Sequence, residues 1–183
     1  MIAPRAQEPS VRELVSAAAV RARVDELAAE VARDFAGRRP LFVAIAEGAR
    51  RFAGALAHGA AARGVDGEIL VVRARRTAGT ELRDVAVEAF DVARCAGRDA
   101  LVVDDIADEG RTLAAVLARV RAAGPRSLRA AVLVNKHARR SVELPLDYVG
   151  FQLEDGWVVG FGMDLAGRFR ELDHLAVVAP GER

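Results

Sequence analysis

The sequence predicts an α/β fold in which a mostly parallel sheet is flanked by helices and a small lobe lies beside it. A short, continuous apolar run such as Leu41–Ala46 is typical of a strand that is buried on both faces. Between such runs, apolar residues recur every three or four positions, as they do in amphipathic helices. Strands that alternate with helices favour parallel pairing. From residue 146 onward the pattern changes to short β segments bounded by glycines, which predicts the small lobe.

The N-terminal part of the chain is predicted to be helical over residues 10–36. Between Val11 and Phe35 the apolar residues recur mostly at three- and four-residue steps, with charged residues between them. Ser10 is followed three places later by Glu13, a pattern that is typical of a capping box at the start of a helix.

The next segment predicts a first strand–helix–strand unit. Leu41–Ala46 forms the first strand, Glu47 and Gly48 begin a turn, a helix of small residues runs to about Arg63, and Glu68–Val72 forms the second strand. Residues 73–99 are predicted to be a mobile loop followed by an irregular connection.

A second unit follows, with a strand over Ala100–Ile106, a turn at residues 108–110 and a helix that begins near Thr112. Gly124 and Pro125 end that helix, and Leu128–Val134 is the next strand. The helix is expected to bury one apolar stripe, formed by Leu113, Val116, Leu117 and Val120. Residues 147–151 and 156–160 are the short β segments assigned to the small lobe.

The composition limits the classes of function. The 183 residues are of the size of one domain, and the net charge of +1, from 27 basic and 26 acidic residues, argues against general nucleic-acid binding. The basic clusters at residues 73–76 and 137–140 are interpreted as solvated loops. No run approaches the roughly 20 apolar residues of a membrane span. The first ten residues lack the features of a secretory signal, so we expect a cytoplasmic protein in which Cys95 is an unreactive thiol.

The strongest candidate site is a cluster of acids at the end of a predicted strand. Asp104 and Asp105 follow Leu101–Val103, and Asp108 stands in the turn before the next helix. Ligands of open α/β sheets bind beyond the carboxyl ends of the strands. The carboxylates suit a polyhydroxylated, magnesium-bound ligand, and the free backbone donors of the helix N-terminus suit a phosphate. In the alternative interpretation, Asp104 and Asp105 merely end a strand and Asp108 caps a helix.

This segment resembles the phosphoribosyl pyrophosphate signature of type I phosphoribosyltransferases, which has apolar residues, two acids, two spacers, Asp, a small hydroxyl residue, Gly, any residue and Thr. The resemblance implies that Asp104 and Asp105 contact the ribose hydroxyls, directly or through Mg²⁺. It implies that Asp108 is the general base beside the purine. The 5′-phosphate would be bound by the Thr112 hydroxyl and by the backbone amides of a contiguous turn. This turn consists of Asp108, Glu109, Gly110, Arg111 and Thr112.

The resemblance extends over roughly residues 40–179 and fits the 6-oxopurine branch of the family. It implies that Lys136 donates to the exocyclic oxygen of the base. Physics agrees with this assignment, because an adenine amino group facing the lysine would leave two donors opposed. Trp157 would stack on the base and the Val158 backbone would meet its edge. Asp164 would serve Mg²⁺ with Asp104 and Asp105, and Arg170 would bind pyrophosphate with the turn at Glu47 and Gly48.

Three positions depart from the family pattern. Glu109 replaces a hydroxyl residue and brings a negative charge beside the phosphate site. Glu47 replaces a basic or amide residue in the pyrophosphate turn, where Arg50 or Arg51 is expected to offset it. Ala74 stands in the lid segment where the family often carries an aromatic ring, so we expect poorer exclusion of water. The arginines of this segment compensate by clamping pyrophosphate in one interpretation and form a plain solvated loop in the other.

These features predict one phosphoribosyltransferase domain over residues 1–183, with a core at about 38–145 and a hood built from residues 10–36 and 146–179. The expected activity is Mg²⁺-dependent transfer of the phosphoribosyl group from phosphoribosyl pyrophosphate to hypoxanthine or guanine. The alternatives are a regulatory protein that binds the same ligands without catalysis, and a transferase for xanthine or a modified purine. A nucleic-acid-binding module is the weakest alternative. The resemblance also implies a homodimer or homotetramer.

Overall fold

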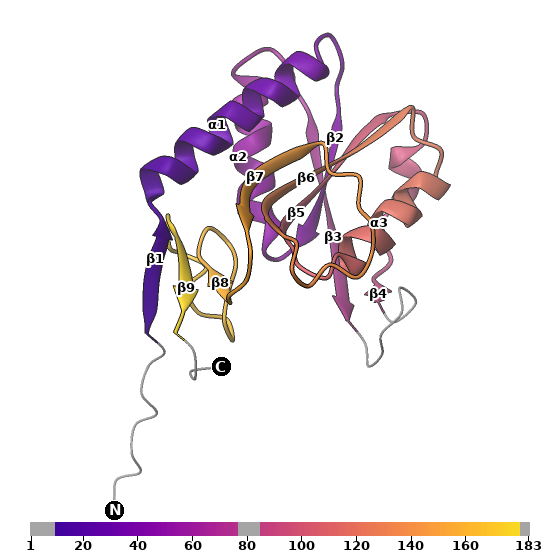
Figure 1. Ribbon diagram of the computed structural model, residues 1–183. Helices are drawn as coiled ribbons and strands as arrows, with labels where there is room; N and C mark the ends of the chain where they lie inside the picture. The colour runs from indigo at the N-terminus through magenta and orange to yellow at the C-terminus, as the bar shows by residue number, and fades with distance from the viewer. Residues whose placement is uncertain (1–9, 77–84, 180–183) are drawn as a thin grey trace, which may run out of the picture.

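The computed structural model describes residues 10–76 and 85–179, and it contains a large sheet and a small one (Figure 1). The large sheet has six strands in the order β4-β3-β2-β5-β6-β7. All neighbours are parallel except β3 and β4. The strands are β2 Leu41–Ala46, β3 Glu68–Arg76, β4 Val85–Val87, β5 Asp99–Ala107, β6 Ser127–Lys136 and β7 Tyr148–Leu153. The predicted α/β fold with a mostly parallel sheet is therefore confirmed.

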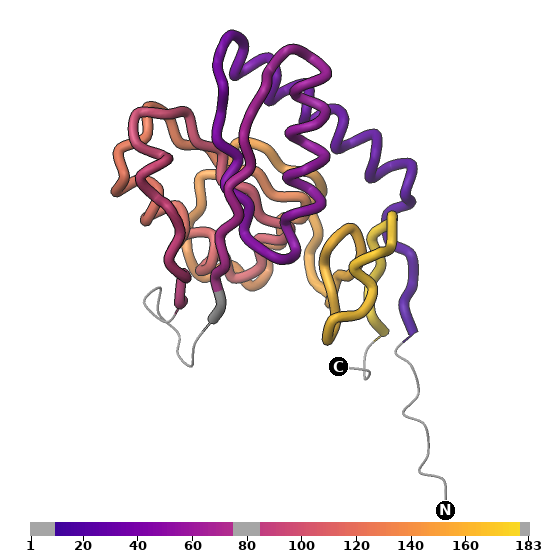
Figure 2. Tube along the Cα trace, turned by 180° about the vertical axis from the view of Figure 1, so that it is seen from behind, coloured from indigo at the N-terminus to yellow at the C-terminus, as the bar shows by residue number. Residues whose placement is uncertain are grey.

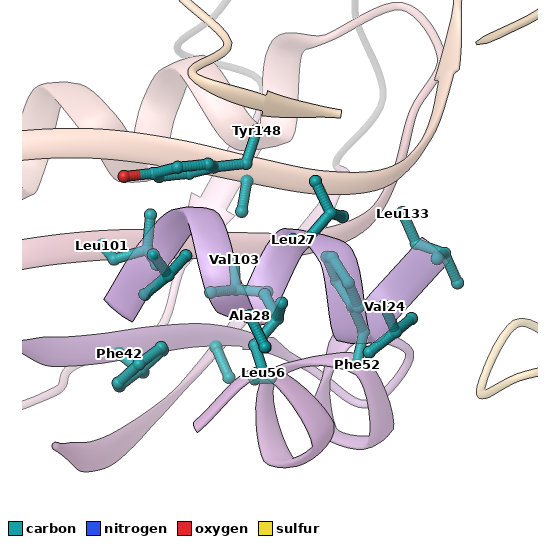
Figure 3. Close-up of a cluster of buried hydrophobic side chains, with 14 of the residues drawn as sticks. Val24, Leu27, Ala28, Phe42, Phe52, Leu56, Leu101, Val103, Leu133 and Tyr148 are labelled. Atoms are coloured by element: carbon teal, nitrogen blue, oxygen red, sulfur yellow. The ribbon is translucent and has the colours of Figure 1, made fainter. Parts of the chain in front are cut away.

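Helices cover both faces of the large sheet. They are α1 Ala17–Asp34, α2 Ala49–Ala61 and α3 Arg111–Ala122, with a short 3₁₀ helix, η2, at Val92–Cys95. The apolar sides of α1 and α2 pack on one face of the sheet, where Phe42, Leu101 and Leu133 are buried (Figure 3). Helix α3 packs on the other face through the predicted apolar stripe, all of which is buried. Strands that are covered on both faces are buried throughout, which explains their continuous apolar runs.

The small sheet joins the two ends of the described chain. Its order is β1-β9-β8, with β1 at Val11–Val15, β8 at Val158–Val159 and β9 at Leu175–Val178. All its pairings are antiparallel. Figures 1 and 2 show this sheet beside the large one, next to the carboxyl end of β7.

The structure corrects the predicted start of the N-terminal helix. Val11–Val15 is a strand, because it pairs with β9. The helix begins at Ala17, and its cap is Ser16, whose hydroxyl accepts from the Ala19 amide at 3.3 Å. The predicted capping box at Ser10 and Glu13 was therefore wrong, since both residues precede the helix by several positions.

Two further predictions need correction. Residues 73–76 continue strand β3, and Ala74 to Arg76 pair with β4, so this part of the predicted loop is a β-strand. The predicted loop also included residues 77–84, which lie outside the described residues. Strand β7 belongs to the large sheet, where it pairs in parallel with β6, and not to the small lobe.

Cys95 is buried, and burial raises the pKa of its thiol. Among the described residues no helix is both long and apolar enough to span a membrane.

Candidate active site

Two adjoining pockets lie at the carboxyl ends of β2, β5 and β6. The strand-end pocket, of about 370 Å³, lies between the turns that follow β2 and β5. The tryptophan pocket, of about 240 Å³, lies between β6 and the segment around β8. The two pockets share Asp105, Ile106, Asp108 and Asp164 in their walls. A ligand with two parts can therefore occupy both, with its junction beside these residues.

The buried Asp104 and the partly buried Asp105 lie near the carboxyl end of β5, at the strand-end pocket. Their carboxylates accept from the next backbone amide in each case: Asp104 from Asp105 at 3.0 Å and Asp105 from Ile106 at 2.9 Å. Burial raises the pKa of Asp104 well above its usual range, and the charge of Asp105 raises it further. Burial also raises the pKa of Asp105. Because burial disfavours the charged forms, the pair is suited to a ligand that brings positive charge.

The turn after β2 lies directly against this pair. A Cβ atom on Gly48 would lie only 1.6 Å from Asp105 Oδ2, so no side chain fits at this position. The Glu47 carboxylate points to two cations, with Arg50 at 3.3 Å and Arg73 at 3.6 Å. The expected offset of the Glu47 charge is therefore supplied by Arg50, with Arg73 added, while Arg51 bonds elsewhere.

The turn after β5 delivers an uncapped helix N-terminus to the same pocket. Gly110 has a φ of +86° and precedes α3, and no side chain caps this helix. The first helical hydrogen bond runs from the Ala114 amide to the Gly110 carbonyl at 2.9 Å. The amides of Arg111, Thr112 and the next residue precede that bond, and such amides are donors for an anion.

The Glu109 side chain turns toward cations rather than into open solvent. Its carboxylate lies 3.4 Å from Arg111 Nε and 3.8 Å from an Arg139 nitrogen. Arg111 also donates to the Ser141 hydroxyl at 3.0 Å. The negative charge that replaces the family's hydroxyl residue is therefore compensated locally.

Asp108 lies where the two pockets meet and has one unused oxygen. Its Oδ2 is 3.4 Å from Lys136 Nζ and 3.6 Å from an Arg139 nitrogen. Its Oδ1 is buried and has no hydrogen-bond partner among the residues that the structure describes. Lys136 ends β6 and is itself buried, with 3% of its surface exposed. A buried, unpaired acceptor beside a held carboxylate oxygen can accept a proton from a ligand.

Arg140 and Ser141 hold the Asp108 turn in place through hydrogen bonds to its backbone. Arg140 donates to the carbonyls of Ala107 at 3.1 Å and Asp108 at 3.2 Å, and to the Asn135 side chain. The Ser141 amide and hydroxyl both donate to the carbonyl of Glu109 at 3.1 Å. The interpretation of residues 137–140 as a solvated loop was therefore wrong for Arg140, which holds the turn in place.

The segment around β8 closes both pockets. Trp157 is 43% exposed and lines the tryptophan pocket, and its indole donates to the Asp164 carbonyl at 3.4 Å. Val158 lies in β8 and also lines this pocket. Asp164 pairs with Arg170 at 2.7 Å and accepts from the Gly167 amide at 2.6 Å. Asp164 and Arg170 both line the strand-end pocket.

Comparison with known proteins decides the family. Residues 10–165 match the family model described as the phosphoribosyl transferase domain. The chain belongs to this family. A hypoxanthine-guanine phosphoribosyltransferase structure from Bacillus anthracis has 30% identity and a TM-score of 0.83, covering 93% of this chain and all of that one. These similarities place the chain in the hypoxanthine-guanine branch of the type I phosphoribosyltransferases.

Curated phosphoribosyltransferase relatives match over part of their length. The bifunctional protein TilS/HprT of Listeria monocytogenes is 30% identical over 167 residues, which cover 91% of this chain and 26% of that protein. The hypoxanthine phosphoribosyltransferase of Salmonella typhimurium is 42% identical over 82 residues, which are 45% of this chain and 46% of that protein. The chain thus spans between a quarter and a half of these relatives.

The structure brings the site residues predicted for a phosphoribosyltransferase into the two pockets. The strand-end pocket gathers Glu47, Gly48, Asp104, Asp105, Asp108, Glu109, Arg111, Thr112, Asp164 and Arg170. The tryptophan pocket gathers Lys136, Trp157 and Val158, whereas Gly110 lines neither pocket and forms the turn that precedes α3. The sequence reasoning missed five residues that also line the tryptophan pocket: Ile106, Arg139, Asp155, Gly156 and Met163. Ile106 follows the acid pair directly and could have been found from that position, whereas the other four had no such signal.

Proposed function

We propose that the chain transfers the 5-phosphoribosyl group from phosphoribosyl pyrophosphate to hypoxanthine or guanine, releasing pyrophosphate and forming IMP or GMP. The observation that carries this proposal is the pair of pockets that meet at Asp105, Ile106, Asp108 and Asp164. A base and a sugar phosphate, one in each pocket, would have their reacting atoms at this junction. The names of the relatives support the same reaction.

The strand-end pocket is assigned to phosphoribosyl pyrophosphate. The 5′-phosphate would lie at the N-terminus of α3 beside Thr112, where backbone donors and the helix dipole favour an anion. The ribose hydroxyls would lie on Asp104 and Asp105. Pyrophosphate would lie on the Glu47–Gly48 turn with Arg170, which lines the same pocket.

The residues present fit Mg²⁺ as an ion carried largely by the substrate. The structure has no group of three or more acidic, His or Cys side chains within its described residues that could hold a metal. Mg²⁺ commonly uses one or two carboxylates together with substrate phosphates. Asp104 and Asp105 offer such carboxylates, and Asp164 would contribute after exchange from Arg170. When bound, the ion would neutralise charge on the pyrophosphate as it leaves.

The tryptophan pocket is assigned to the base. The ring would stack on Trp157 with its edge at Val158, and Lys136 would donate to the 6-oxo group. As the bond from the anomeric carbon to pyrophosphate breaks, the base nitrogen forms the new bond. The ring proton passes to Asp108, whose Oδ1 has a free acceptor position. Alignment and charge stabilisation supply most of the acceleration.

The first test is a spectrophotometric assay of nucleotide formation from phosphoribosyl pyrophosphate and Mg²⁺ with hypoxanthine, guanine, xanthine and adenine in parallel. Turnover with hypoxanthine or guanine alone supports the proposal, and turnover with xanthine or adenine alone replaces it. In the active enzyme, Asp108→Asn should lower kcat by roughly 10²–10⁴-fold, the contribution typical of a general base. Unchanged turnover at saturating substrates would remove Asp108 from that role.

A non-catalytic ligand-binding protein is the second candidate, favoured by Ala74, which lines the strand-end pocket without an aromatic ring. The arginine partners of Glu47 and Glu109 weaken this alternative. Calorimetric binding of phosphoribosyl pyrophosphate without turnover of any base would establish it. We also propose that the chain is one domain whose small sheet supports the base site, and that it forms a homodimer or homotetramer, which light scattering would measure.

A further inference from the structure

Arg51 connects the helix after the pyrophosphate turn to the far side of the site. It is the third residue of α2, which begins immediately after Gly48. Its guanidinium donates to the carbonyls of Glu171 at 3.2 Å and Leu172 at 2.9 Å, and pairs with Asp173. Arg51 lines neither of the two pockets, as their described walls define them.

The same guanidinium also lies over an aromatic ring at the start of the segment that it binds. Its central carbon is 4.5 Å from the centre of the Phe161 ring. We name residues 160–173 the hood segment. Since Phe161 lies near one end of the hood segment and Leu172 near the other, Arg51 holds both ends. The Phe161 amide closes the segment by donating to the Leu172 carbonyl at 2.8 Å.

The hood segment carries substrate-facing groups on a backbone that needs support. Asp164 and Arg170 project from it into the strand-end pocket. Phe161, Ala166 and Phe169 have φ values of 50°, 50° and 74°, which non-glycine residues adopt only where their surroundings determine the conformation. The contacts that Arg51 makes at the two ends are of the kind that can impose such a conformation.

The hood segment also rests directly on the pyrophosphate turn. A Cβ atom on Gly162 would lie 2.3 Å from the Gly48 carbonyl oxygen and 3.6 Å from Arg51 Cβ. The Gly162 carbonyl accepts from Arg170 at 3.0 Å, so this contact point is bonded to the arginine assigned to pyrophosphate. A shift of the segment away from α2 would therefore move Arg170 relative to the turn.

We propose that Arg51 is a positioning residue for pyrophosphate, which holds the hood segment against the Gly48 turn so that Arg170 and Asp164 face the leaving group. This inference rests on the proposed transferase function. It assigns to Arg51 no contact with either substrate. The purine contacts of Lys136 lie on β6 and do not depend on this connection.

The test compares Arg51→Met with Arg63→Met in the full chain. Arg63 is a matched control because it also bonds a carboxylate and a carbonyl, those of Asp25 and Gly59, and its side chain is 35% exposed against 34% for Arg51. Arg63 links α2 to α1 and lines neither pocket. Arg51→Lys, which keeps the charge and some donors, is the conservative variant.

Two readouts separate the role of Arg51 from general stability. In hydrogen exchange without ligands, Arg51→Met should speed exchange of the Phe161 and Gly162 amides about tenfold, because those amides bond within the segment that Arg51 holds. In kinetics, it should raise the KM for phosphoribosyl pyrophosphate, and for pyrophosphate in the reverse reaction, by about tenfold or more. The KM for hypoxanthine should change less, and Arg51→Lys should recover part of both effects.

Several outcomes would overturn the inference. Exchange and KM values for Arg51→Met that equal those of Arg63→Met would show that Arg51 is merely structural. Faster exchange with an unchanged KM for phosphoribosyl pyrophosphate would show that the position of the segment does not matter to the ligand. If the unmodified chain transfers to no base, the proposed function fails, while an unchanged exchange rate still refutes the holding role separately.

Discussion

Replacement of Lys136 by Met tests the assignment of the base pocket most directly. The side chain is buried at the end of β6, and its ammonium group lies 3.4 Å from Asp108. Met keeps most of the apolar stem and removes the donor. A hydrogen bond to a charged group contributes roughly 1.5–3 kcal/mol, so kcat/KM for hypoxanthine should fall by roughly 10- to 150-fold.

The same substitution should relax the choice of base. In the unmodified protein an adenine amino group would face the Lys136 donor, and this opposition disappears in Lys136→Met. The ratio of kcat/KM for adenine to that for hypoxanthine should therefore rise by at least the factor lost with hypoxanthine. Parallel initial-rate assays with both bases measure this ratio directly.

Arg139→Met is the matched control for Lys136→Met. Arg139 also approaches Asp108 Oδ2, at 3.6 Å, but its side chain is half exposed, so the pair should contribute only about 0–1 kcal/mol. If both variants lose the same activity and both still reject adenine, Lys136 acts through the charge of Asp108 and the reasoning about the 6-oxo group is refuted. The melting temperature of each variant checks that folding is retained.

Three other substitutions test separate parts of the structure. Asp104→Asn should lower activity yet raise the melting temperature, and the rise should be larger at pH 8 than at pH 4. Burial raises the pKa of Asp104 in the folded state, so the folded protein binds the proton more tightly than the unfolded chain does. The stability of the unmodified protein therefore falls as pH rises above the unfolded pKa of about 4. Differential scanning fluorimetry across pH measures this, and an equal or larger gain at pH 4 would contradict it. Gly48→Ala should lower kcat/KM by about 100-fold or more, because its Cβ must displace Asp105 Oδ2; steady-state activity near that of the parent would show that the turn can move freely. Tyr148→Phe removes a hydroxyl that donates to Asp34 at 3.0 Å and accepts from Arg129 at 2.8 Å, so it should cost about 2 kcal/mol, or roughly 4–8 °C in Tm, with kcat unchanged. A thermal melt and an activity assay decide both parts.

Much of the large sheet could be predicted because its signals are local. Each run such as Leu41–Ala46 is continuous, apolar and flanked by turn residues, and the structure buries nearly all of it. The small sheet gave weaker signals. Val11, Leu14 and Val15 fit a helical spacing as well as a strand, and the pairing with β9 at the other end of the chain decides between them.

The site residues also differ in how well the sequence predicts them. Asp104, Asp105 and Asp108 lie within five consecutive positions, and the parallel order of β5 and β6 brings Lys136 to the same edge. By contrast, the roles of Arg139 and Arg140 depend on the path of the loop after β6, which residue spacing does not specify. Both arginines lie in a run with the composition of a solvated loop. Only the folded geometry shows that Arg140 holds the Asp108 turn and that Arg139 lies near the Asp108 carboxylate.

The position of β9 in the small sheet has a consequence for biosynthesis. Leu175–Val178 is translated after the rest of the described sheet elements, yet it is the central strand between β1 and β8. The emerging chain can form β2, β5 and α2 on the ribosome while β1 and β8 still have unsatisfied edges. Truncated translation products that stop before Leu175 would therefore expose those edges, and such fragments are expected substrates for chaperones and proteases.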